Sequence, residues 1–394
     1  MIAYLWVFLT AAGVTFVATP VVRRAAVKAG AIDQPSDRKV HPHPTPTMGG
    51  IAMYVGFLAA LLLSRFLPFF GDLNAASPEP LAAFIGCTLM VGLGAIDDTR
   101  GASAIAKLTA QVFIAGVVVL LGVQLTYFVL PLFGGDSVAQ IVVLSADLSV
   151  ILTIGWIVFV ANAVNLVDGL DGLAAGMVAI ASGVFFLFMV RSPSLFGDAS
   201  QAALLSSIAA GICVGFLPWN FHPAKIFMGD TGSMLLGMLL ALATISGVGR
   251  NPFPPSPGDL AATFGPVLVP LLIFAIAFLD VALAVIRRTR RGTGIGHADK
   301  QHLHHRLMDI GHGHRQAVLL MYLWSLLLSL SGLAIGLIEG RFVVGMILIG
   351  ASVLFLITAG PRLATRRNGN GNTDEEGSHE IAPPAREPEK RSSP

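Results

Sequence analysis

Residues 154–173 read IGWIVFVANAVNLVDGLDGL, an apolar stretch that ends in four polar side chains. Its first half has the Val, Ile, Phe and Trp composition of a membrane-spanning helix. Asn162, Asn165, Asp168 and Asp171 follow at three-residue spacing, so we expect them near one another on one helical face or its first turn. Capping of the next helix would occupy only one Asp. Four polar groups beside a membrane span therefore predict a functional site.

The composition indicates a membrane protein. Of the 394 residues, 54% are hydrophobic and 12% are charged, and the mean hydropathy is +0.75. An average soluble domain has about 25% charged residues. Cys87 and Cys213, the two cysteines, lie inside apolar runs, which argues against a disulfide framework or a zinc–cysteine site. We predict an all-α polytopic integral membrane protein.

Eleven apolar segments have the length of a membrane span, about 17–25 residues. No basic residue precedes the first one, and no cleavage site is evident, which predicts an uncleaved helix with the N-terminus outside. Residues 123–148 are ambiguous between a re-entrant or interfacial piece and a short hairpin. We expect a transmembrane domain over 1–360 and a disordered cytoplasmic tail over 361–394. The predicted spans are 2–22, 49–67, 81–96, 105–122, 149–166, 172–190, 202–218, 232–249, 262–286, 318–337 and 342–359.

Basic residues are divided unequally between the two sets of loops. One set holds 21 of the 25 Lys and Arg, or 15 without the tail, and the other holds four. The positive-inside rule places the first set in the cytoplasm. Every polar cluster described below lies on that side. The first set consists of residues 23–48, 97–107, 219–231, 287–317 and the tail after residue 360.

Two segments near the start of the chain carry charge. The loop DQPSDRKVHPHPTPTMGG includes His41 and is either a positive membrane anchor or a loop folded against another part of the protein. Asp97 and Asp98 are adjacent at the end of the third span, where two carboxylates repel each other. A divalent cation or a proton-accepting role would explain them. Structural pairing with Arg100 or Lys107 is the alternative.

The segment PWNFHPAKIFMGDTGSM leads into the eighth span. Asp230 stands where the helix is expected to begin, and free N–H groups there attract phosphate while a carboxylate can hold Mg²⁺. Asn220 and Phe227 can hydrogen-bond and stack a base. A helix cap alone would account for Asp230, but not for Gly229 and Gly232.

The loop over residues 287–317 holds six of the ten histidines. His302, His304 and His305 form the group HLHH, which is compatible with zinc or with an anion. Basic neighbours such as Arg306 make the surroundings electropositive, and this favours phosphate or sugar over a metal ion.

Together these groups suit phosphoryl transfer with a divalent metal, in which Asp and Asn hold Mg²⁺ and basic groups steady the phosphate. One substrate should be soluble and anionic and the other lipid-borne. A proton-coupled transporter is the alternative, but its carboxylates would lie near mid-membrane, where only Asp280 is expected. No nucleic-acid partner is expected, and the sequence leaves a homodimer open.

Five segments resemble the signature regions of the polyprenyl-phosphate N-acetylhexosamine-1-phosphate transferases. They follow one another between about residues 20 and 330 and read DRKVHPHPTPTMGG, DDTRG, NAVNLVDGLDGL, NFHPAKIFMGDTGS and DKQHLHHRL. The HLHH segment is similar to the WecA/TagO branch, and the text around it to actinobacterial WecA-type enzymes, rather than to the MraY branch. The acidic motif of the family often has a third Asp where this chain has Gly101.

The resemblance implies a reaction. N-acetylglucosamine-1-phosphate would pass from UDP-GlcNAc to undecaprenyl or decaprenyl phosphate by direct attack, with release of UMP, at the cytoplasmic face of a bacterial plasma membrane. This would be the first membrane step of a cell-wall or surface glycan. Phospho-MurNAc-pentapeptide or another UDP-HexNAc is the alternative donor. The implied cofactor is Mg²⁺, which Mn²⁺ can replace.

The resemblance also implies roles for individual residues. The implied metal ligands are Asn165 and Asp230, and the implied catalytic groups are Asp97, Asp98, Asp168, Asp230 and His304. The uridine would be lined by Asn162, Asp168, Asp171, Asn220 and Phe227. Further substrate contacts are expected from His302, His305, Arg306, Lys107 and His41.

Overall fold

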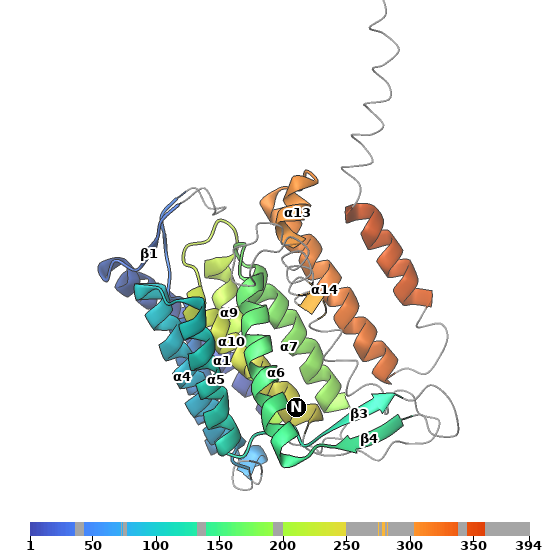
Figure 1. Cartoon of the computed structure of the whole chain (residues 1–394). Coiled ribbons are helices and arrows are strands. Elements are labelled where there is room, and N and C mark those ends of the chain that lie inside the picture. The colour runs from blue at the N-terminus through green and yellow to red at the C-terminus, as the bar shows by residue number, and fades with distance from the viewer. Residues whose placement is uncertain are drawn as a thin grey trace, which may run out of the picture.

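Figure 1 shows the protein as a computed structural model of the full chain. The structure describes residues 1–35, 43–71, 73, 77–131, 139–191, 200–249, 275, 278–279, 282, 303–337 and 345–358. His41, His302, Asp280 and the predicted tail lie outside the described residues. For His304 and His305 only the backbone is described.

The described residues form a bundle of α-helices (Figure 1). Seven helices are long and apolar enough to cross a membrane, and three shorter apolar helices accompany them. Ten of the eleven predicted spans overlap one of these helices; within the other, 262–286, the described residues are helical. The protein is an all-α polytopic membrane protein, as predicted. The helices are α1 (Ile2–Lys28), α2 (Gly50–Phe66), α4 (Glu79–Arg100), α5 (Ala104–Leu120), α6 (Ala146–Val167), α7 (Leu173–Arg191), α9 (Gln201–Asn220), α10 (Gly229–Val248), α13 (Leu303–Asp309), α14 (His314–Leu337) and Gly345–Thr358, with the short 3₁₀ helix η1 (Pro68–Phe70).

Two antiparallel hairpins interrupt the helices. Strand β1 (Ile32–Asp33) pairs with β2 (Thr45–Pro46), and β3 (Tyr127–Pro131) pairs with β4 (Ala139–Val143). The second hairpin settles the ambiguity of residues 123–148. Its β-branched and aromatic residues suit an extended strand.

The turns that carry the predicted site lie at one end of the bundle, and the N-terminus lies at the other (Figure 1). At the first end, which we call the site end, Phe227 N donates to Pro46 O and Gly49 N donates to Phe227 O, each at 2.8 Å. At the other end, Ser200 N donates to the hydroxyl of Tyr4 at 2.8 Å. The described parts of the sequence motifs therefore gather on one side, as the hydropathy pattern predicted.

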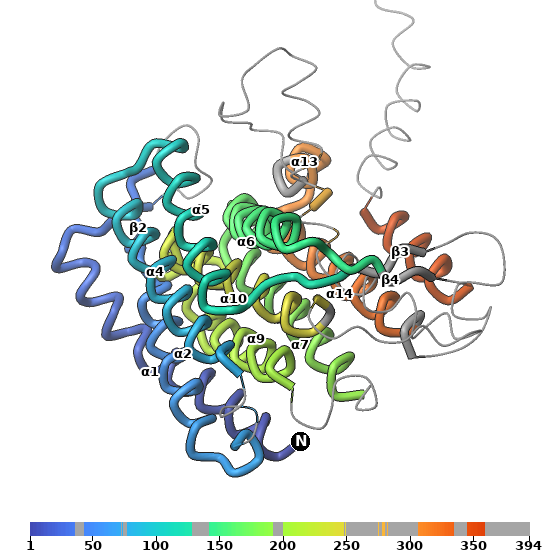
Figure 2. Tube along the Cα trace, turned by 60° about the horizontal axis from the view of Figure 1, so that its bottom comes forward, coloured from blue at the N-terminus to red at the C-terminus, as the bar shows by residue number. Residues whose placement is uncertain are grey.

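Helix α10 is enclosed by the bundle, since 83% of its apolar stretch is buried against 22% for α1. It packs on α2, α4, α6, α7 and α9 and lies near the middle of Figure 2. Glycines allow close approach to its first turn. A Cβ at Gly94 would lie 2.5 Å from the backbone of Asp230 and Thr231, and one at Gly50 would lie 2.1 Å from Gly232 N. The helices α2 and α4 can therefore press against the start of α10, where several site residues lie.

Candidate active site

A chain of ion pairs links three helices at the site end. Lys107 Nζ, near the start of α5, donates to Asp97 Oδ2 of α4 at 2.7 Å and also to Asp230 Oδ2 of α10. Asp97 Oδ1 accepts from Ala102 N at 2.6 Å. The three charged side chains are between 15% and 22% exposed, so their charges are partly shielded from water and attract more strongly than at an open surface.

Asn165 extends this chain of contacts into α6. Its Nδ2 donates to Asp230 Oδ1 at 2.8 Å and to Ser233 Oγ at 2.9 Å. We call Asp97, Lys107, Asn165 and Asp230 the carboxylate–lysine network. Lys107 is one of the two residues that the sequence offered as a structural ion-pair partner for Asp97 and Asp98.

Asp98 has a different role from its neighbour. Its Oδ1 accepts from Asp230 N at 2.8 Å, and its Oδ2 accepts from Thr231 N at 3.0 Å and from Thr231 Oγ1 at 2.6 Å. A carboxylate here satisfies the first N–H groups of α10 and is favoured by the helix dipole. The prediction that these N–H groups are free for phosphate is therefore wrong. A Cβ at Gly229, where φ is +69°, would lie 2.4 Å from Asp98 Oδ2, which explains the glycine.

Asp168 directly follows the last residue of α6. Burial, and then the charges of Asp230, Asp98 and Asp171, raise the pKa of its carboxyl to about 8. Its carboxyl group therefore lies in an electronegative place that favours a proton or a cation.

The four polar side chains of residues 154–173 do not share one environment. Asn162 Nδ2 donates to Gln111 Oε1 of α5 at 2.6 Å and to Val158 O at 2.8 Å, and Gln111 is buried. Asn162 therefore has other partners than Asn165 and Asp171, and the nearness of all four side chains stays a prediction. The structure shows Asn162 as a contact between α5 and α6, and its place at the uridine stays a prediction.

The turn between α6 and α7 is held at Gly172 by two side chains. Gly172 N donates to Asn220 Oδ1 at 3.1 Å, and Gly172 O accepts from the hydroxyl of Tyr322 on α14. Asn220 Nδ2 also donates to Ile226 O at 3.0 Å, and this side chain is buried. Both ends of the amide are occupied by backbone, so the structure favours a structural role for Asn220 over the predicted contact with a base. Gly172 has φ +78°, which explains the glycine.

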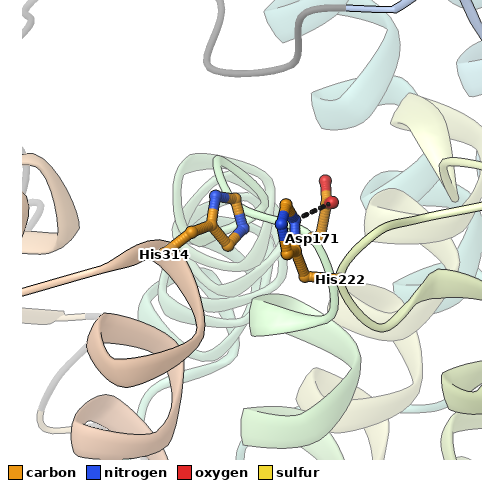
Figure 3. Close-up of side chains that lie close together, drawn as sticks. All are labelled: Asp171, His222 and His314. Carbon is orange, nitrogen blue, oxygen red and sulfur yellow. Dashed lines mark hydrogen bonds and ion pairs between the residues drawn. The ribbon is translucent and has the colours of Figure 1, made fainter.

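Asp171 belongs to a second cluster, with two histidines (Figure 3). Its Oδ2 accepts from Ala224 N at 3.0 Å and lies 2.7 Å from His222 Nδ1. The ring of His222 stacks on that of His314, the first residue of α14, with centroids 4.1 Å apart and planes inclined by 23°. One ligand atom from each of these three side chains lies within 4.8 Å of the other two. We call Asp171, His222 and His314 the Asp–His–His cluster.

Two further predicted residues have places at the site end. Phe227 is half-buried, and its backbone joins the loop before α10 to β2 and to the residues that follow β2. Arg306 is exposed on α13. Nothing in these places tests their predicted contacts with substrate.

Sequence reasoning gave no role to four side chains that shape this region. Gln111 carried a signal, because an amide inside an apolar helix needs a partner. His222 and His314 stand close to motifs that were recognised, but their meeting depends on the packing of α14. Tyr322 lies in an apolar stretch and carries no signal in the sequence.

The two groups of side chains offer different ligands to a cation. The carboxylate–lysine network has carboxylate and amide oxygens, which suit a hard ion such as Mg²⁺. The ammonium of Lys107 between two carboxylates shows that positive charge is favoured there. The Asp–His–His cluster offers one carboxylate and two imidazoles, a set that suits softer metals.

Comparison with known proteins is consistent with this arrangement. A family model described as glycosyl transferase family 4 matches residues 80–248. A decaprenyl-phosphate N-acetylglucosaminephosphotransferase of Mycolicibacterium smegmatis is 42% identical over 324 residues, which cover 80% of this chain and 78% of that protein. The chain belongs to glycosyl transferase family 4.

Two other relatives show the range of this similarity. A probable undecaprenyl-phosphate N-acetylglucosaminyl 1-phosphate transferase of Bacillus subtilis is 34% identical over 335 residues, covering 85% of this chain and 86% of that protein. A phospho-N-acetylmuramoyl-pentapeptide-transferase of Desulforudis audaxviator is 33% identical over 353 residues, covering 83% and 97%. The family 4 match runs from α4 to α10 and so contains the whole carboxylate–lysine network, whereas His314 lies beyond it.

Proposed function

We propose that this chain transfers N-acetylglucosamine-1-phosphate from UDP-GlcNAc to a polyprenyl phosphate and releases UMP. The observation that carries the proposal is the network in which Lys107 joins Asp97 to Asp230 at one end of a membrane bundle. Phosphoryl transfer depends on alignment and on neutralisation of the phosphate charge, and the network supplies groups for both. The names of the relatives from M. smegmatis and B. subtilis support the sugar and the lipid.

We further propose that the site end faces the cytoplasm of a bacterial plasma membrane. The loops predicted for that side hold 21 of the 25 Lys and Arg. A soluble nucleotide sugar and a lipid phosphate can meet only near the boundary between hydrocarbon and water. A site at the end of the spans meets this requirement.

The residues of the network fit Mg²⁺ as the cofactor. Asp230 supplies a carboxylate, and the amide of Asn165 lies beside it, so a rotation of the amide would present its carbonyl oxygen to the same place. When bound, Mg²⁺ would neutralise the charge that develops on the diphosphate.

The side chains of the network then have separate tasks. An oxygen of the lipid phosphate attacks the phosphorus that bears the sugar, and the bond from that phosphorus to the UMP oxygen breaks. Asp97 can accept the proton of a singly protonated lipid phosphate, while Lys107 steadies a phosphate oxygen. Asp98 positions Asp230 by holding the first turn of α10.

A phospho-MurNAc-pentapeptide donor is the second candidate. The relative from D. audaxviator favours it. The HLHH segment favours UDP-GlcNAc, since it resembles the WecA/TagO branch. The two candidates share one site and differ only in the donor.

The test is a transfer assay on the purified chain in detergent. With Mg²⁺ and decaprenyl or undecaprenyl phosphate, UDP-GlcNAc should yield a lipid-linked sugar, and EDTA should abolish the product. Asp230→Asn should lower turnover on the order of 10²–10³-fold, because it removes a group that acts on the developing charge. Asp147→Asn, exposed at the start of α6, is the matched control and should keep full activity. Wild-type turnover in Asp230→Asn, or product from UDP-MurNAc-pentapeptide alone, would refute the proposal.

A further inference from the structure

We propose that the Asp–His–His cluster binds a transition-metal ion of the Zn²⁺ class, at a site separate from the carboxylate–lysine network. The three side chains come from three elements that are distant in the sequence. Asp171 lies in the turn between α6 and α7, His222 in the loop between α9 and α10, and His314 at the first position of α14. Figure 3 shows the two rings and the carboxylate gathered at one place.

The ligand set selects the metal. Two imidazoles and one carboxylate form a set that Zn²⁺, Co²⁺, Ni²⁺ and Cu²⁺ accept. Mg²⁺ instead prefers oxygen ligands and gives up its water reluctantly. A cell's excess of Mg²⁺ should therefore leave this cluster open to a softer ion. Three protein ligands also leave room for a water molecule or an anion on the metal.

The distances allow one ion to reach all three ligands. Zn²⁺ ligands at about 2.0–2.1 Å in tetrahedral array lie about 3.3 Å from one another. The cluster brackets this value, since Asp171 Oδ2 and His222 Nδ1 are 2.7 Å apart and all three ligand atoms lie within 4.8 Å.

The surroundings favour a cation at this place. His314 Nε2 is buried and has no hydrogen-bond partner among the described residues, which is costly unless a ligand satisfies it. The charge of Asp171 is one of the causes that raise the pKa of the nearby Asp168 carboxyl, after burial and the charges of Asp230 and Asp98. The nearby ammonium of Lys225 lies over the ring of Trp219, 5.2 Å from its centroid.

We call residues 168–172, between α6 and α7, the acidic turn. An ion in the cluster would join the acidic turn to the start of α14. Its effect on turnover rests on the proposed function, in which Asp171 lines the uridine. A metal that holds Asp171 should then raise the KM for UDP-GlcNAc. Binding of the metal itself does not depend on that function.

The experiment measures metal binding without nucleotide or lipid. The full chain is purified on a tag that contains no histidine, stripped with EDTA, and titrated with Zn²⁺ by calorimetry and with Co²⁺ by absorbance, in excess Mg²⁺. One ion per chain should bind. His314→Gln and Asp171→Asn should each weaken binding by at least about 10-fold. His312→Gln is the matched control, because His312 contacts Thr358 O and lies outside the cluster.

Unchanged Zn²⁺ affinity in His314→Gln would overturn the proposal. Loss of binding in a variant without His302, His304 and His305, with no effect of His314→Gln, would also overturn it by placing the ion on HLHH. X-ray absorption of the Zn²⁺-loaded wild type tests the site even if a variant misfolds. Two imidazoles and at least one oxygen are expected as ligands, and three imidazoles would contradict the assignment.

Discussion

The carboxylate–lysine network and the Asp–His–His cluster lie at the same end of the bundle but are built from different parts. Every member of the network stands on a helix near its end, on α4, α5, α6 or α10. The cluster instead takes one residue from a turn, one from a loop and one from the first position of α14. Helix packing fixes the first group directly, whereas the second depends on contacts that hold its loops.

Glycines show the same difference. In the network, Gly94 lets α4 touch the backbone of α10. Beside the cluster, Gly176 of α7 leaves space for a side chain, since a Cβ there would lie 2.0 Å from Tyr322 Cζ. The ring of Tyr322 thus fits against α7 while its hydroxyl holds Gly172. We infer that helix packing holds the network in place, whereas the acidic turn depends on Tyr322 together with Asn220.

Lys107→Met should disturb the network most. It leaves Asp97 and Asp230 near each other without their counter-ion, and the loss of one partner from a partly buried pair costs about 1–3 kcal/mol. In EDTA the Tm of Lys107→Met should be several degrees below that of the wild type. Addition of Mg²⁺ should raise the Tm of the variant more than it raises the Tm of the wild type. Turnover should fall on the order of 10²-fold.

Scanning fluorimetry in detergent, with and without Mg²⁺, measures this effect. Lys225→Met, which removes an exposed ammonium on the neighbouring loop, is the control and should change the Tm little. A Lys107→Met variant that melts like the wild type in EDTA would show that the network does not need its ammonium. Charge pairing would then not distinguish the carboxylate–lysine network from the Asp–His–His cluster.

Gly176→Ala should disturb the acidic turn through Tyr322. The added methyl group collides with the ring, so we expect turnover on UDP-GlcNAc to fall on the order of 10-fold, because small displacements of substrate-binding groups cost about that much or more. Tyr322→Phe removes only the hydrogen bond to Gly172 and should have a smaller effect.

A double-mutant cycle separates this contact from a general effect on α7. In the background of Tyr322→Ala the collision is absent, so Gly176→Ala should cost little more. Gly183→Ala is the matched control on the same helix, since a Cβ at Gly183 meets nothing within 4 Å. Equal losses from Gly176→Ala in both backgrounds would show that Tyr322 does not hold the turn.

Much of the fold could be predicted because hydropathy decides membrane spans. Ten predicted spans overlap described helices, and the side on which Asp97, Asp171 and Asp230 gather follows from counting spans. The pairing of β3 with β4 could not be chosen in advance, because a short apolar run of this kind fits a strand or an interfacial segment equally well.

The site could be predicted only as far as residue type carries chemistry. The contact of Asn165 with Asp230 could be expected, because the sequence motifs assign both residues to one metal site. The capping of α10 by Asp98 could not, because it depends on the close approach of α4 to α10, which no local sequence pattern encodes. The contact of Asn162 with Gln111 was not predicted, because Gln111 stands alone in an apolar helix. Spacing along one helix gives a shared face, and the neighbouring helices decide what that face meets.

The effect of Asp168→Asn on stability should depend on pH and should be smallest at low pH. The pKa of Asp168 is 3.8 for a free carboxyl and about 8 in the folded chain, so between these values the native state keeps a proton that the unfolded state has lost. Stability therefore falls as the pH rises through this window. Asn cannot ionise, so in EDTA the Tm of the variant relative to that of the wild type should rise from pH 5 to pH 9. Asp147→Asn, exposed on α6, should keep a constant offset, and parallel curves for Asp168→Asn and wild type would mean that this carboxyl is already ionised at pH 5. Mg²⁺ should reduce this difference in Tm, because a cation near the network stabilises the ionised form of Asp168. Such a response would show that the charges of the acidic turn and of the network interact.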